Sequence, residues 1–521
     1  MILFDNVTYD FPGGTRALDN VSVHIGPGEK ITVIGNNGSG KTTFALLING
    51  ILKAAAGRVE VCDLDPLDDE QNRRLKQKVG LVFQNPDNQL VSSTVEREIA
   101  FSLENRNLPR TEMIEKVAGA LSQFHLEDYR DRLTSELSGG EKQRLALAAV
   151  MVAEPDILIL DEPGSFLDES GRRSLDVAVE RLLAARPDLT VIRITQYTEV
   201  AAKADRLLVF GGGRLLADDH PDKVFGDEAL CRRAGIAPPL HYRLMSGNAD
   251  KAETAGVTRT EPGLGASSIS LKLDFKYNGQ ETFILHEADL EIRGGRVYGL
   301  VGPTGCGKTT LAQLLARLLK PTRGEVRYRG FDPKPGAVAV SFQHPERQFF
   351  LDTVEKEIRF GAENLKRPDI DHMTVATYEH IGLDRMTFGN RDPFSLSGGE
   401  KRRLAFGTIL PVKPMFIMFD EPTCGLDAHG TELFKQMVRR LKADGTGLVI
   451  ISHQGDIILD LADEIITIKD QKPTRPQPTT EFFLNEKYAE YLSCPEIITY
   501  QLNRFGEVKY FTEAELVRSI V

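Results

Sequence analysis

Leu137-Ser138-Gly139-Gly140-Glu141-Lys142-Gln143-Arg144 returns almost unchanged later in the chain, as Leu396-Ser397-Gly398-Gly399-Glu400-Lys401-Arg402-Arg403. In each copy a serine and two glycines open a run of apolar and basic residues that is typical of a helix. The first turn of a helix carries backbone N–H groups without intrahelical partners and a partial positive charge, so it attracts anions. Each octet therefore predicts an anion site at the start of a helix, and phosphate is the anion we expect.

The two octets are part of an internal duplication. The matched pairs, each 259 residues apart, are Gln84 and Gln343, Ser138 and Ser397, and Asp161 and Asp420. Gly302 lies 267 residues after Gly35, so the first copy carries eight more residues ahead of Gln84. We expect a polar surface insertion at residues 63–78 to accommodate them, because surface loops tolerate added length at little cost in free energy.

Each copy alternates apolar runs of strand length with runs of helical pattern. The order strand, loop, helix, strand is typical of α/β folds with a parallel sheet. The expected strands are residues 21–25, 30–34, 79–83 and 157–162 and their counterparts 288–292, 296–301, 338–342 and 415–421, and the expected helices are residues 43–52 and 310–319.

One glycine-rich loop follows the second expected strand of each copy. The two loops read GNNGSGKT at residues 35–42 and GPTGCGKT at residues 302–309. Both match G-x-x-x-x-G-K-[ST], in which glycines let the backbone wrap phosphates, the lysine reaches the β and γ oxygens, and the hydroxyl ligates Mg²⁺. The expected nucleotide contacts are Gly35, Asn36, Asn37, Gly38, Ser39, Gly40, Lys41, Thr42 and Thr43, and Gly302, Pro303, Thr304, Gly305, Cys306, Gly307, Lys308, Thr309 and Thr310.

Two adjacent carboxylates end a later apolar strand in each copy. Asp161 and Asp420 are placed to hold Mg²⁺ through water, together with Thr42 and Thr309. Glu162 and Glu421, which follow them, are placed to orient or deprotonate an attacking water. Exposed acids at a strand end are the simpler explanation for one such pair, but the identical spacing after both octets argues against it.

Together these motifs resemble the ABC ATPases, whose LSGGQ or LSGGE signature contacts nucleotide held by the opposite ATPase unit. The resemblance implies an α/β fold with two ABC-type P-loop ATPase domains. Each domain would have a RecA-like parallel-sheet core, an antiparallel β subdomain and a helical signature subdomain, and ATP and Mg²⁺ would be the cofactors. It also implies intramolecular pairing of the two halves, in which Ser397 and Gly399 complete the first site and Ser138 and Gly140 complete the second.

The glutamines Gln84 and Gln343 resemble the family's Q-loop residues, which touch the metal or the water and report to a transport partner. In each copy a second glutamine and the sequence Thr-Val-Glu-x-Glu-Ile follow. This combination resembles the energy-coupling factor and cobalt-type branch of the family. The residues concerned are Gln89 with residues 94–99 and Gln348 with residues 353–358.

The copies differ where the family has a switch histidine that bonds near the γ-phosphate. The second copy has His453, whereas the first has Gln196, which can donate a hydrogen bond but cannot carry a proton. The expected catalytic residues are therefore Glu162, Glu421, His453 and Gln196, and we expect the second site to do most of the hydrolysis. Tyr9 and Tyr277 lie 26 and 25 residues before their loops, where the family places a ring against adenine; a core aromatic is the alternative.

The composition of two stretches suggests the domain boundaries. Both are rich in residues such as Gly, Pro and Thr, which are typical of linkers and turns. We expect a first ATPase domain at residues 1–234, a linker at 235–268, a second ATPase domain at 269–475 and a C-terminal tail at 476–521. The tail is expected to pack against the second domain, with regulation or partner contact as the alternative.

Charge and hydropathy narrow the class of partner. The formal net charge of −11 argues against nucleic acid as the main partner, and five scattered cysteines indicate reduced thiols without zinc or disulfides. No apolar run approaches the roughly 20 residues of a membrane-spanning helix. We therefore expect a peripheral protein on the cytoplasmic face of the cell membrane, held there by partners.

The leading hypothesis is the ATP-hydrolysing subunit of an importer of the energy-coupling factor type. Its cargo would be a vitamin, a vitamin precursor or a transition-metal ion, and its partners a membrane-embedded scaffold and a substrate-binding membrane subunit. One alternative is a soluble tandem ABC ATPase that acts on ribosomes or in DNA repair. The acidic balance and the absence of a long basic linker, a coiled-coil insertion and an N-terminal cysteine cluster argue against it. A sugar-importer ATPase is a further alternative.

Overall fold

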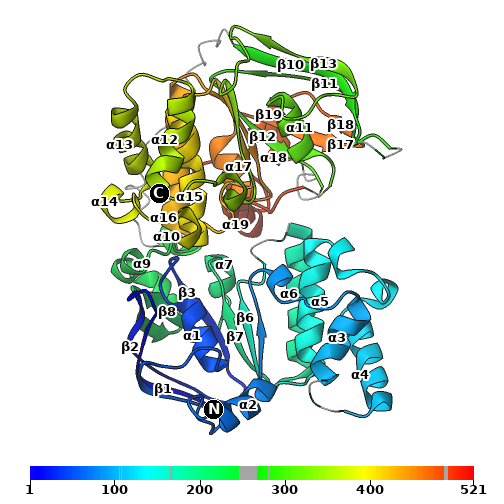
Figure 1. Cartoon of the computed structure of the whole chain (residues 1–521), viewed down its shortest axis with the longest axis vertical. Helices are drawn as coiled ribbons and strands as arrows, with labels where there is room; N and C mark the ends of the chain where they lie inside the picture. Colours follow the sequence, from blue (N-terminus) through cyan, green and yellow to red (C-terminus); the bar gives the residue numbers. More distant parts are fainter. Residues whose placement is uncertain are drawn as a thin grey trace. The chain divides into compact units, whose positions relative to one another are not determined.

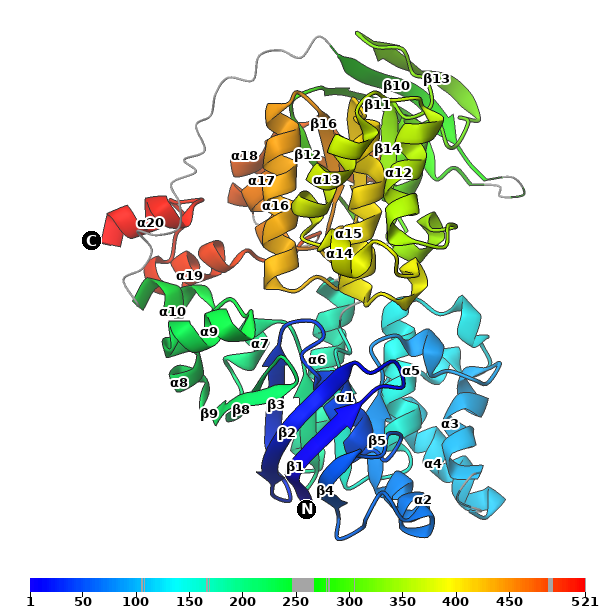
Figure 2. The ribbon, with the colours of Figure 1, turned by 60° about the vertical axis from the view of Figure 1, so that its left-hand side comes forward.

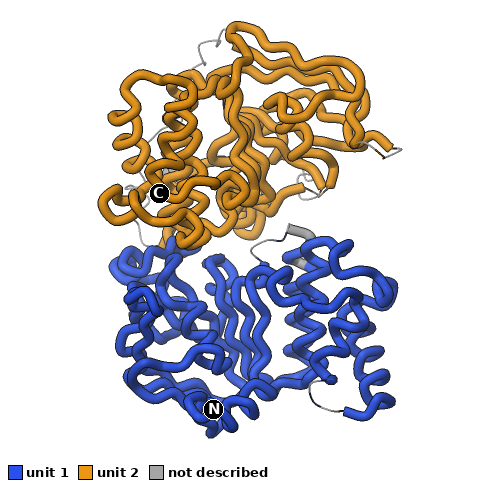
Figure 3. Tube along the Cα trace, in the orientation of Figure 1, with its two compact units in different colours: residues 1–239 blue, residues 240–521 orange. Residues whose placement is uncertain are grey.

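In the computed structural model the chain divides into two compact units, residues 1–239 and residues 240–521 (Figure 3). The structure describes every residue except 105, 107, 165, 166, 168, 246–266, 278, 280, 281, 304, 486–490 and 521. The division after Pro239 falls inside the expected linker 235–268, most of which lies outside the described residues. In the part of the chain that is described, no helix is both long and apolar enough to cross a membrane.

The core of the first unit is a six-stranded sheet in the order β5-β6-β7-β3-β8-β9, in which only β9 is antiparallel to its neighbour (Figure 1). All five residues of β6 are buried, because helices cover both faces of the sheet. The strands are β3 (Lys30–Gly35), β5 (Val79–Val82), β6 (Ile157–Asp161), β7 (Thr190–Ile194), β8 (Arg206–Gly211) and β9 (Arg214–Asp219).

A smaller antiparallel sheet, ordered β2-β1-β4, forms the second part of this unit. From Val21 to Ile25 buried and exposed residues alternate, as expected for a sheet with one face on the core. Phe4 on that face packs against Phe44 of helix α1, with ring centroids 4.8 Å apart, so α1 lies between the two sheets. The elements are β1 (Ile2–Asp10), β2 (Arg16–Ile25), β4 (Ala56–Val61) and α1 (Lys41–Ile48).

Helices form the third part of the first unit. Their apolar faces share one hydrophobic cluster with residues of β6 such as Leu158 and Leu160. These helices are α3 (Val95–Glu104), α4 (Arg110–Gln123), α5 (Gly139–Met151) and α6 (Glu169–Ala185). The remaining helices are α2 (Asp69–Lys78), α7 (Thr198–Ala201), α8 (Pro221–Gly226) and α9 (Glu228–Ala234).

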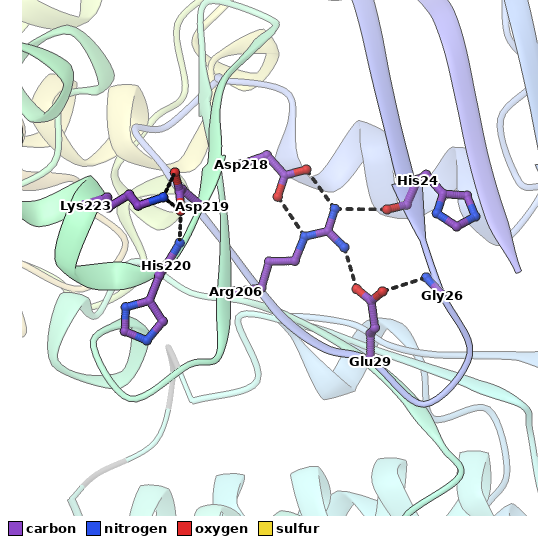
Figure 4. Close-up of polar contacts among 8 residues, drawn as sticks. All are labelled: His24, Gly26, Glu29, Arg206, Asp218, Asp219, His220 and Lys223. Atoms are coloured by element: carbon purple, nitrogen blue, oxygen red, sulfur yellow. Dashed lines mark hydrogen bonds and ion pairs between the residues drawn. The ribbon is translucent and has the colours of Figure 1, made fainter.

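Arg206 at the start of β8 ties the two sheets of the first unit together (Figure 4). Its guanidinium donates to both carboxylate oxygens of Asp218 at 2.7 Å, to the carbonyl of His24 at 2.9 Å, and to Glu29. Glu29 in turn accepts the N–H of Gly26 at 3.1 Å. Hydrogen bonding to Asp218 raises the pKa of Arg206 further above its ordinary value. The turn between β2 and β3 is therefore fixed against β8 and β9.

The second unit repeats this plan. Its small sheet is ordered β11-β10-β13 and its core sheet β14-β15-β16-β12-β17-β18, with β19 paired to β17. The strands are β10 (Ser268–Phe275), β11 (Leu285–Arg293), β12 (Val297–Val301), β13 (Arg323–Arg329), β14 (Val338–Ser341), β15 (Phe416–Asp420), β16 (Gly447–Ile451), β17 (Glu464–Lys469), β18 (Lys472–Pro473) and β19 (Gln477–Pro478). The helices are α11 (Lys308–Leu315), α12 (Val354–Asn364), α13 (Ile370–Ile381), α14 (Arg385–Phe388), α15 (Gly398–Ile409), α16 (Ala428–Ala443) and α17 (Gly455–Leu461). Both units thus have the three parts that the sequence predicts.

Four further helices pack on the second unit, three of them from the C-terminal tail (Figure 2). They are α10 (Leu240–Met245), α18 (Thr479–Leu484), α19 (Glu496–Phe505) and α20 (Glu513–Ile520). Leu240, Phe483, Ile498 and Leu516 are buried in the same hydrophobic cluster as the helical part of this unit. The prediction that the tail packs against the second unit is confirmed.

Two details differ from the sequence analysis. The helices expected at residues 43–52 and 310–319 begin two residues earlier and end at Ile48 and Leu315. Gly50 and Arg317, both with positive φ, follow these ends, and the left-handed region is incompatible with a continuing helix. The polar insertion of the first unit contains helix α2, which Asp68 caps by accepting two backbone N–H groups.

Candidate functional site

The glycine-rich loops connect β3 to α1 and β12 to α11, at the carboxyl ends of central parallel strands. Gly35 has φ 150°, and a Cβ there would lie 2.2 Å from the carbonyl oxygen of Phe210. Gly40 has φ 103°, and its Cβ would lie 2.6 Å from the carbonyl oxygen of Ala17. Gly302 and Gly307 repeat these angles at 154° and 101°. Only glycine fits these four positions, because both the backbone angles and the available space exclude a side chain.

Lys41 and Lys308 begin the helices after these loops and are buried. Each ammonium donates to two carbonyl oxygens at the start of its loop, at 2.9 and 2.8 Å for Lys41 and at 2.7 and 2.9 Å for Lys308. Neither helix has a side-chain cap or an acidic residue in its first turn. A buried ammonium beside uncapped helix N–H groups is an arrangement that suits a phosphate. Thr304 lies outside the described residues.

Asp161 and Asp420 end β6 and β15 and are buried. Thr309 Oγ1 donates to Asp420 at 2.6 Å, and the Thr42 hydroxyl bonds to Asp161 in the same way. Burial raises the pKa of Asp161 to about 6 and also raises that of Asp420. A cation beside these carboxylates would favour their ionised form.

The donor set fits Mg²⁺ bound together with phosphates. Within the described ranges no group of three or more His, Cys, Asp or Glu is arranged to hold a metal by itself. Mg²⁺ in nucleotide sites usually takes one or two protein ligands and completes its shell with phosphate oxygens and water. A threonine and an aspartate in each unit match that pattern.

Glu162 and Glu421 follow the aspartates with φ angles of 45° and 47°. The left-handed conformation costs about 1–2 kcal/mol for such residues, and strain of this kind concentrates at functional sites. Each N–H donates to a carbonyl of the neighbouring strand, Ile194 at 3.0 Å and Ile451 at 2.9 Å. Burial, with a smaller contribution from the charge of Asp420, raises the pKa of Glu421 to about 8.

The surroundings of the two glutamates differ. Gln84 Nε2 donates to Glu162 Oε2 at 3.0 Å. Glu421 Oε1 is buried without a hydrogen-bond partner and lies 3.6 Å from His453 Nε2. The Oε1 atom of Gln196 is likewise buried without a hydrogen bond. The first glutamate is therefore held by an amide, whereas the second faces an imidazole.

The helix that begins at each octet also supports the adjacent glutamine loop. The buried Arg402 donates to the carbonyl oxygens of Phe342, at 2.9 Å, and Gln343, at 2.5 Å. Gln143 at the matching position makes one such bond, to Phe83 at 3.3 Å. The sequence analysis did not single out either residue, and the only signal was that this position differs between two otherwise similar octets.

The second glutamines and the Thr-Val-Glu-x-Glu-Ile motif have structural roles. Gln89 Oε1 accepts the N–H of Phe83 at 3.0 Å, and Gln348 makes the same bond to Phe342 at 2.8 Å. The buried Glu98 accepts the N–H groups of Val91 and Ser92 at 2.9 and 2.6 Å. Glu357 does the same for Phe350 and Leu351.

The serines of the octets are helix caps. Ser138 Oγ accepts the N–H of Glu141, whose carboxylate accepts the N–H of Ser138 at 2.7 Å, and Ser397 and Glu400 repeat this capping box. A Cβ at Gly398 would meet nothing within 4 Å, whereas one at Gly140 would lie 3.4 Å from Cα of Gly171. The predicted contact of Ser138, Gly140, Ser397 and Gly399 with nucleotide of the opposite site stays a prediction.

The strand register shows that Tyr9 and Tyr277, the two aromatics predicted to stack on adenine, do not occupy equivalent positions in the two units. Tyr9 pairs with Leu18, whereas Phe275 pairs with Leu285, which is the counterpart of Leu18. Tyr277 therefore corresponds to Phe11 rather than to Tyr9, and the two rings are 40% and 41% exposed. Tyr9 instead packs at the edge of the hydrophobic cluster of the first unit.

Each unit thus brings its predicted phosphate, metal and catalytic residues together at one edge of its core sheet. Comparison with known proteins fits this arrangement: the sequence model of a family described as ABC transporter matches residues 18–165 and 285–424. A Methanosarcina mazei protein, provisionally named as an ABC transporter ATP-binding protein, is 31% identical and aligns with 93% of this chain and 90% of its own length. A Bacillus subtilis protein, provisionally named as the HMP/thiamine import ATP-binding protein YkoD, is 30% identical over 87% of this chain and 86% of its own length.

One solved structure also matches over most of the chain. It is the archaeal ribosome recycling factor aABCE1, in a complex with the ribosomal stalk protein aP1. The TM-score is 0.62, over 93% of this chain and 92% of that chain, at 19% sequence identity. At that identity the likeness is one of fold alone.

Proposed function

The chain belongs to the family of ABC transporter ATP-binding proteins, ATP-hydrolysing enzymes, and from this premise we propose that it powers import of a small solute through membrane-embedded partner subunits. The solute class is a vitamin, a vitamin precursor or a transition-metal ion, as in importers of the energy-coupling factor type. The name of the relative YkoD, which refers to HMP and thiamine import, supports a vitamin precursor or vitamin.

The observation that carries this proposal is an exposed apolar pair beside the glutamine loop of each unit. Val91 and Phe101 are 68% and 44% exposed, and Phe350 and Phe360 at the matching positions are 61% and 39% exposed. The rings of Phe350 and Phe360 contact each other edge to face, with centroids 4.6 Å apart. Exposed apolar surface that recurs at the same place in two repeats indicates a docking surface for a partner.

Hydrogen bonds link this surface to the ATP site. The N–H of Phe350 is held by the buried Glu357, and the nearby Gln348 holds the N–H of Phe342, next to Gln343. A partner that moves the exposed rings would therefore shift the backbone of Gln343, the glutamine that we expect to contact the metal or the water. The first unit has the same bonds through Gln89 and Glu98.

Within each site the chain's own residues divide the work as follows. Bound MgATP supplies the phosphoryl group, which Lys41 or Lys308 and the helix N–H groups would hold by charge and hydrogen bonds. Thr42 and Asp161, or Thr309 and Asp420, would bind Mg²⁺. The glutamate beyond each aspartate would orient the attacking water and accept its proton.

We further propose that the second site dominates hydrolysis. His453 faces the free carboxylate oxygen of Glu421, whereas Glu162 accepts a hydrogen bond from Gln84 and has only the neutral Gln196 in place of the histidine. An imidazole can exchange a proton near neutral pH, and an amide cannot. The first site then serves mainly to bind ATP.

Capture of partners from native membranes tests the importer role. Tagged wild-type protein, recovered from detergent-solubilised membranes after a high-salt wash, should retain a multi-span membrane protein and a small substrate-binding membrane protein. The variant V91D/F350D should lose both, because a charge on the docking surface would have to be buried unpaired. The control L67D places the same charge on an apolar residue of the α2 region that is 51% exposed, and it should retain both.

Other outcomes point to the other functions. Recovery of ribosomal or DNA-repair proteins without a membrane subunit would replace the importer with a soluble ABC ATPase. Recovery of a membrane scaffold whose reconstituted complex takes up a sugar would identify a sugar importer. Equal recovery of the membrane proteins by V91D/F350D and wild type would refute the docking surface.

A further inference from the structure

The C-terminal tail contacts the loop that carries His453. The N–H of Ser493 donates to the carbonyl oxygen of His453 at 3.0 Å, and Ser493 Oγ accepts the N–H of Gly455 at 2.9 Å. The carbonyl oxygen of Tyr491 lies 3.4 Å from His453 Nδ1. Two tail residues therefore make two contacts with His453 and one with Gly455, two residues later.

This approach requires a glycine at position 455. A Cβ there would lie 2.0 Å from the carbonyl oxygen of Ser493 and 3.0 Å from Cδ of Pro495. The first unit has Thr198 at the equivalent place, two residues after Gln196 and likewise the first residue of a helix. The side chain of Thr198 excludes the same approach in the first unit, so the contact is specific to the second.

The tail also selects which ring nitrogen faces Glu421. A carbonyl oxygen only accepts hydrogen bonds, so the contact with Tyr491 places a proton on Nδ1 of His453. Nε2 is then directed at Glu421 Oε1, 3.6 Å away. A histidine without this contact could rotate or change tautomer, and the nitrogen that faces the glutamate would no longer be fixed.

The tail is itself anchored at the start of the second unit. Arg243 of α10 bonds to Glu496 at 2.8 Å and to Glu513 at 2.6 Å, and the N–H of Leu240 donates to Glu496 at 3.3 Å. The N–H of Glu496 donates to Asp456, the residue that follows Gly455, at 2.9 Å. One chain of contacts thus runs from α10, where the chain enters this unit, through α19 to the histidine loop.

We propose that the tail segment 491–496 is a positioning element of the second ATP site. It holds His453 with Nε2 toward Glu421, and α10 holds the segment in place through Glu496. A displacement of α10 would therefore loosen the tail and slow hydrolysis at this site alone. The inference rests on the proposed role of His453.

The test uses the full chain with E162Q, so that the measured ATPase rate reports the second site. G455A, whose Cβ displaces Ser493, should lower kcat about tenfold, within the range produced by misplacing a catalytic group, and should change KM by less than about twofold. Hydrogen exchange of peptides that cover residues 491–505 should accelerate. T198A, which places the same side chain at the equivalent residue of the first unit, should leave kcat within about twofold.

Milder variants keep the test decisive where G455A does not fold. S493A removes only the hydroxyl that accepts the Gly455 N–H, and S493T restores it. S493A should lower kcat and S493T should recover it. R243A should also lower kcat, because it releases Glu496 and Glu513.

Two results would overturn the inference, and they are distinguishable. If exchange shows that the tail is released while kcat stays unchanged, the tail does not position the site. If H453A retains full kcat, the histidine has no role that needs positioning, and the argument from His453 for dominance of the second site fails as well.

Discussion

Replacing Glu421 by glutamine should stabilise the nucleotide-free protein, and by more as the pH rises. Glu421 is buried beside Asp420, and its Oε1 makes no hydrogen bond. These surroundings disfavour the ionised carboxylate and raise its pKa from 4.5 to about 8. Glutamine has nearly the same shape and no charge, so it removes this penalty.

The sign and size of this change in the free energy of unfolding follow from the linkage between protonation and folding. The folded pKa of Glu421 is raised, so its protonated form favours folding below pH 4.5, and that contribution is lost as the pH rises through about 8. At pH 6 the unfolded carboxyl is ionised while the folded one is protonated. Between pH 6 and pH 9 the penalty grows by roughly two pKa units, or about 2–3 kcal/mol. The advantage of E421Q over wild type should increase by that amount.

Urea unfolding of the nucleotide-free protein at pH 6 and pH 9 measures the effect. The midpoint advantage of E421Q over wild type should be roughly twice as large at pH 9 as at pH 6. The matched control is E162Q, because Glu162 already accepts a hydrogen bond from Gln84 at 3.0 Å and should gain no such advantage. An equal stability difference between E421Q and wild type at both pH values would refute the reasoning.

Three further predictions concern activity and packing. E421Q should lower the ATPase rate of the whole chain by roughly 10²-fold or more, and E162Q by less than about twofold; equal losses would disprove the proposed asymmetry. F11A should weaken binding of a fluorescent ATP analogue at the first site by about 2–10-fold, since an aromatic contact is worth roughly 0.5–1.5 kcal/mol; a larger loss in Y9A would instead favour Tyr9. R402A should destabilise the second unit in urea by roughly 1–3 kcal/mol, because it removes two hydrogen bonds from a charged donor to the part-buried carbonyls of Phe342 and Gln343, and Q143A should cost less.

The short motifs were readable from the sequence because their chemistry is local. The glycine-rich loops require glycines at fixed spacing, and the strands before them are apolar because they are buried on both faces. The constant offset of 259 residues between copies then placed Glu162 and Glu421, and with them one site in each unit. Fold class and the core of each site followed from these short motifs, from their repetition and from the family that they resemble.

Contacts between distant residues decided the rest. Arg402 supports the glutamine loop about 60 residues away, and only the β1–β2 register identifies Phe11 as the counterpart of Tyr277. The left-handed backbone of Glu421 is held by the neighbouring strand. None of these has a periodic or spacing signal, because each depends on how strands and helices pack.

The loop that carries His453 shows most clearly what the sequence determined and what the tertiary structure decided. The sequence alone determined that the second copy has His453 and a glycine two residues later, and that the first has Gln196 and Thr198. Only the tertiary structure revealed why Gly455 is needed: the tail passes so close that a Cβ would lie 2.0 Å from the Ser493 carbonyl. Ser493 is 38 residues from Gly455 along the chain, and such a contact is set by the packing of the whole unit rather than by local sequence.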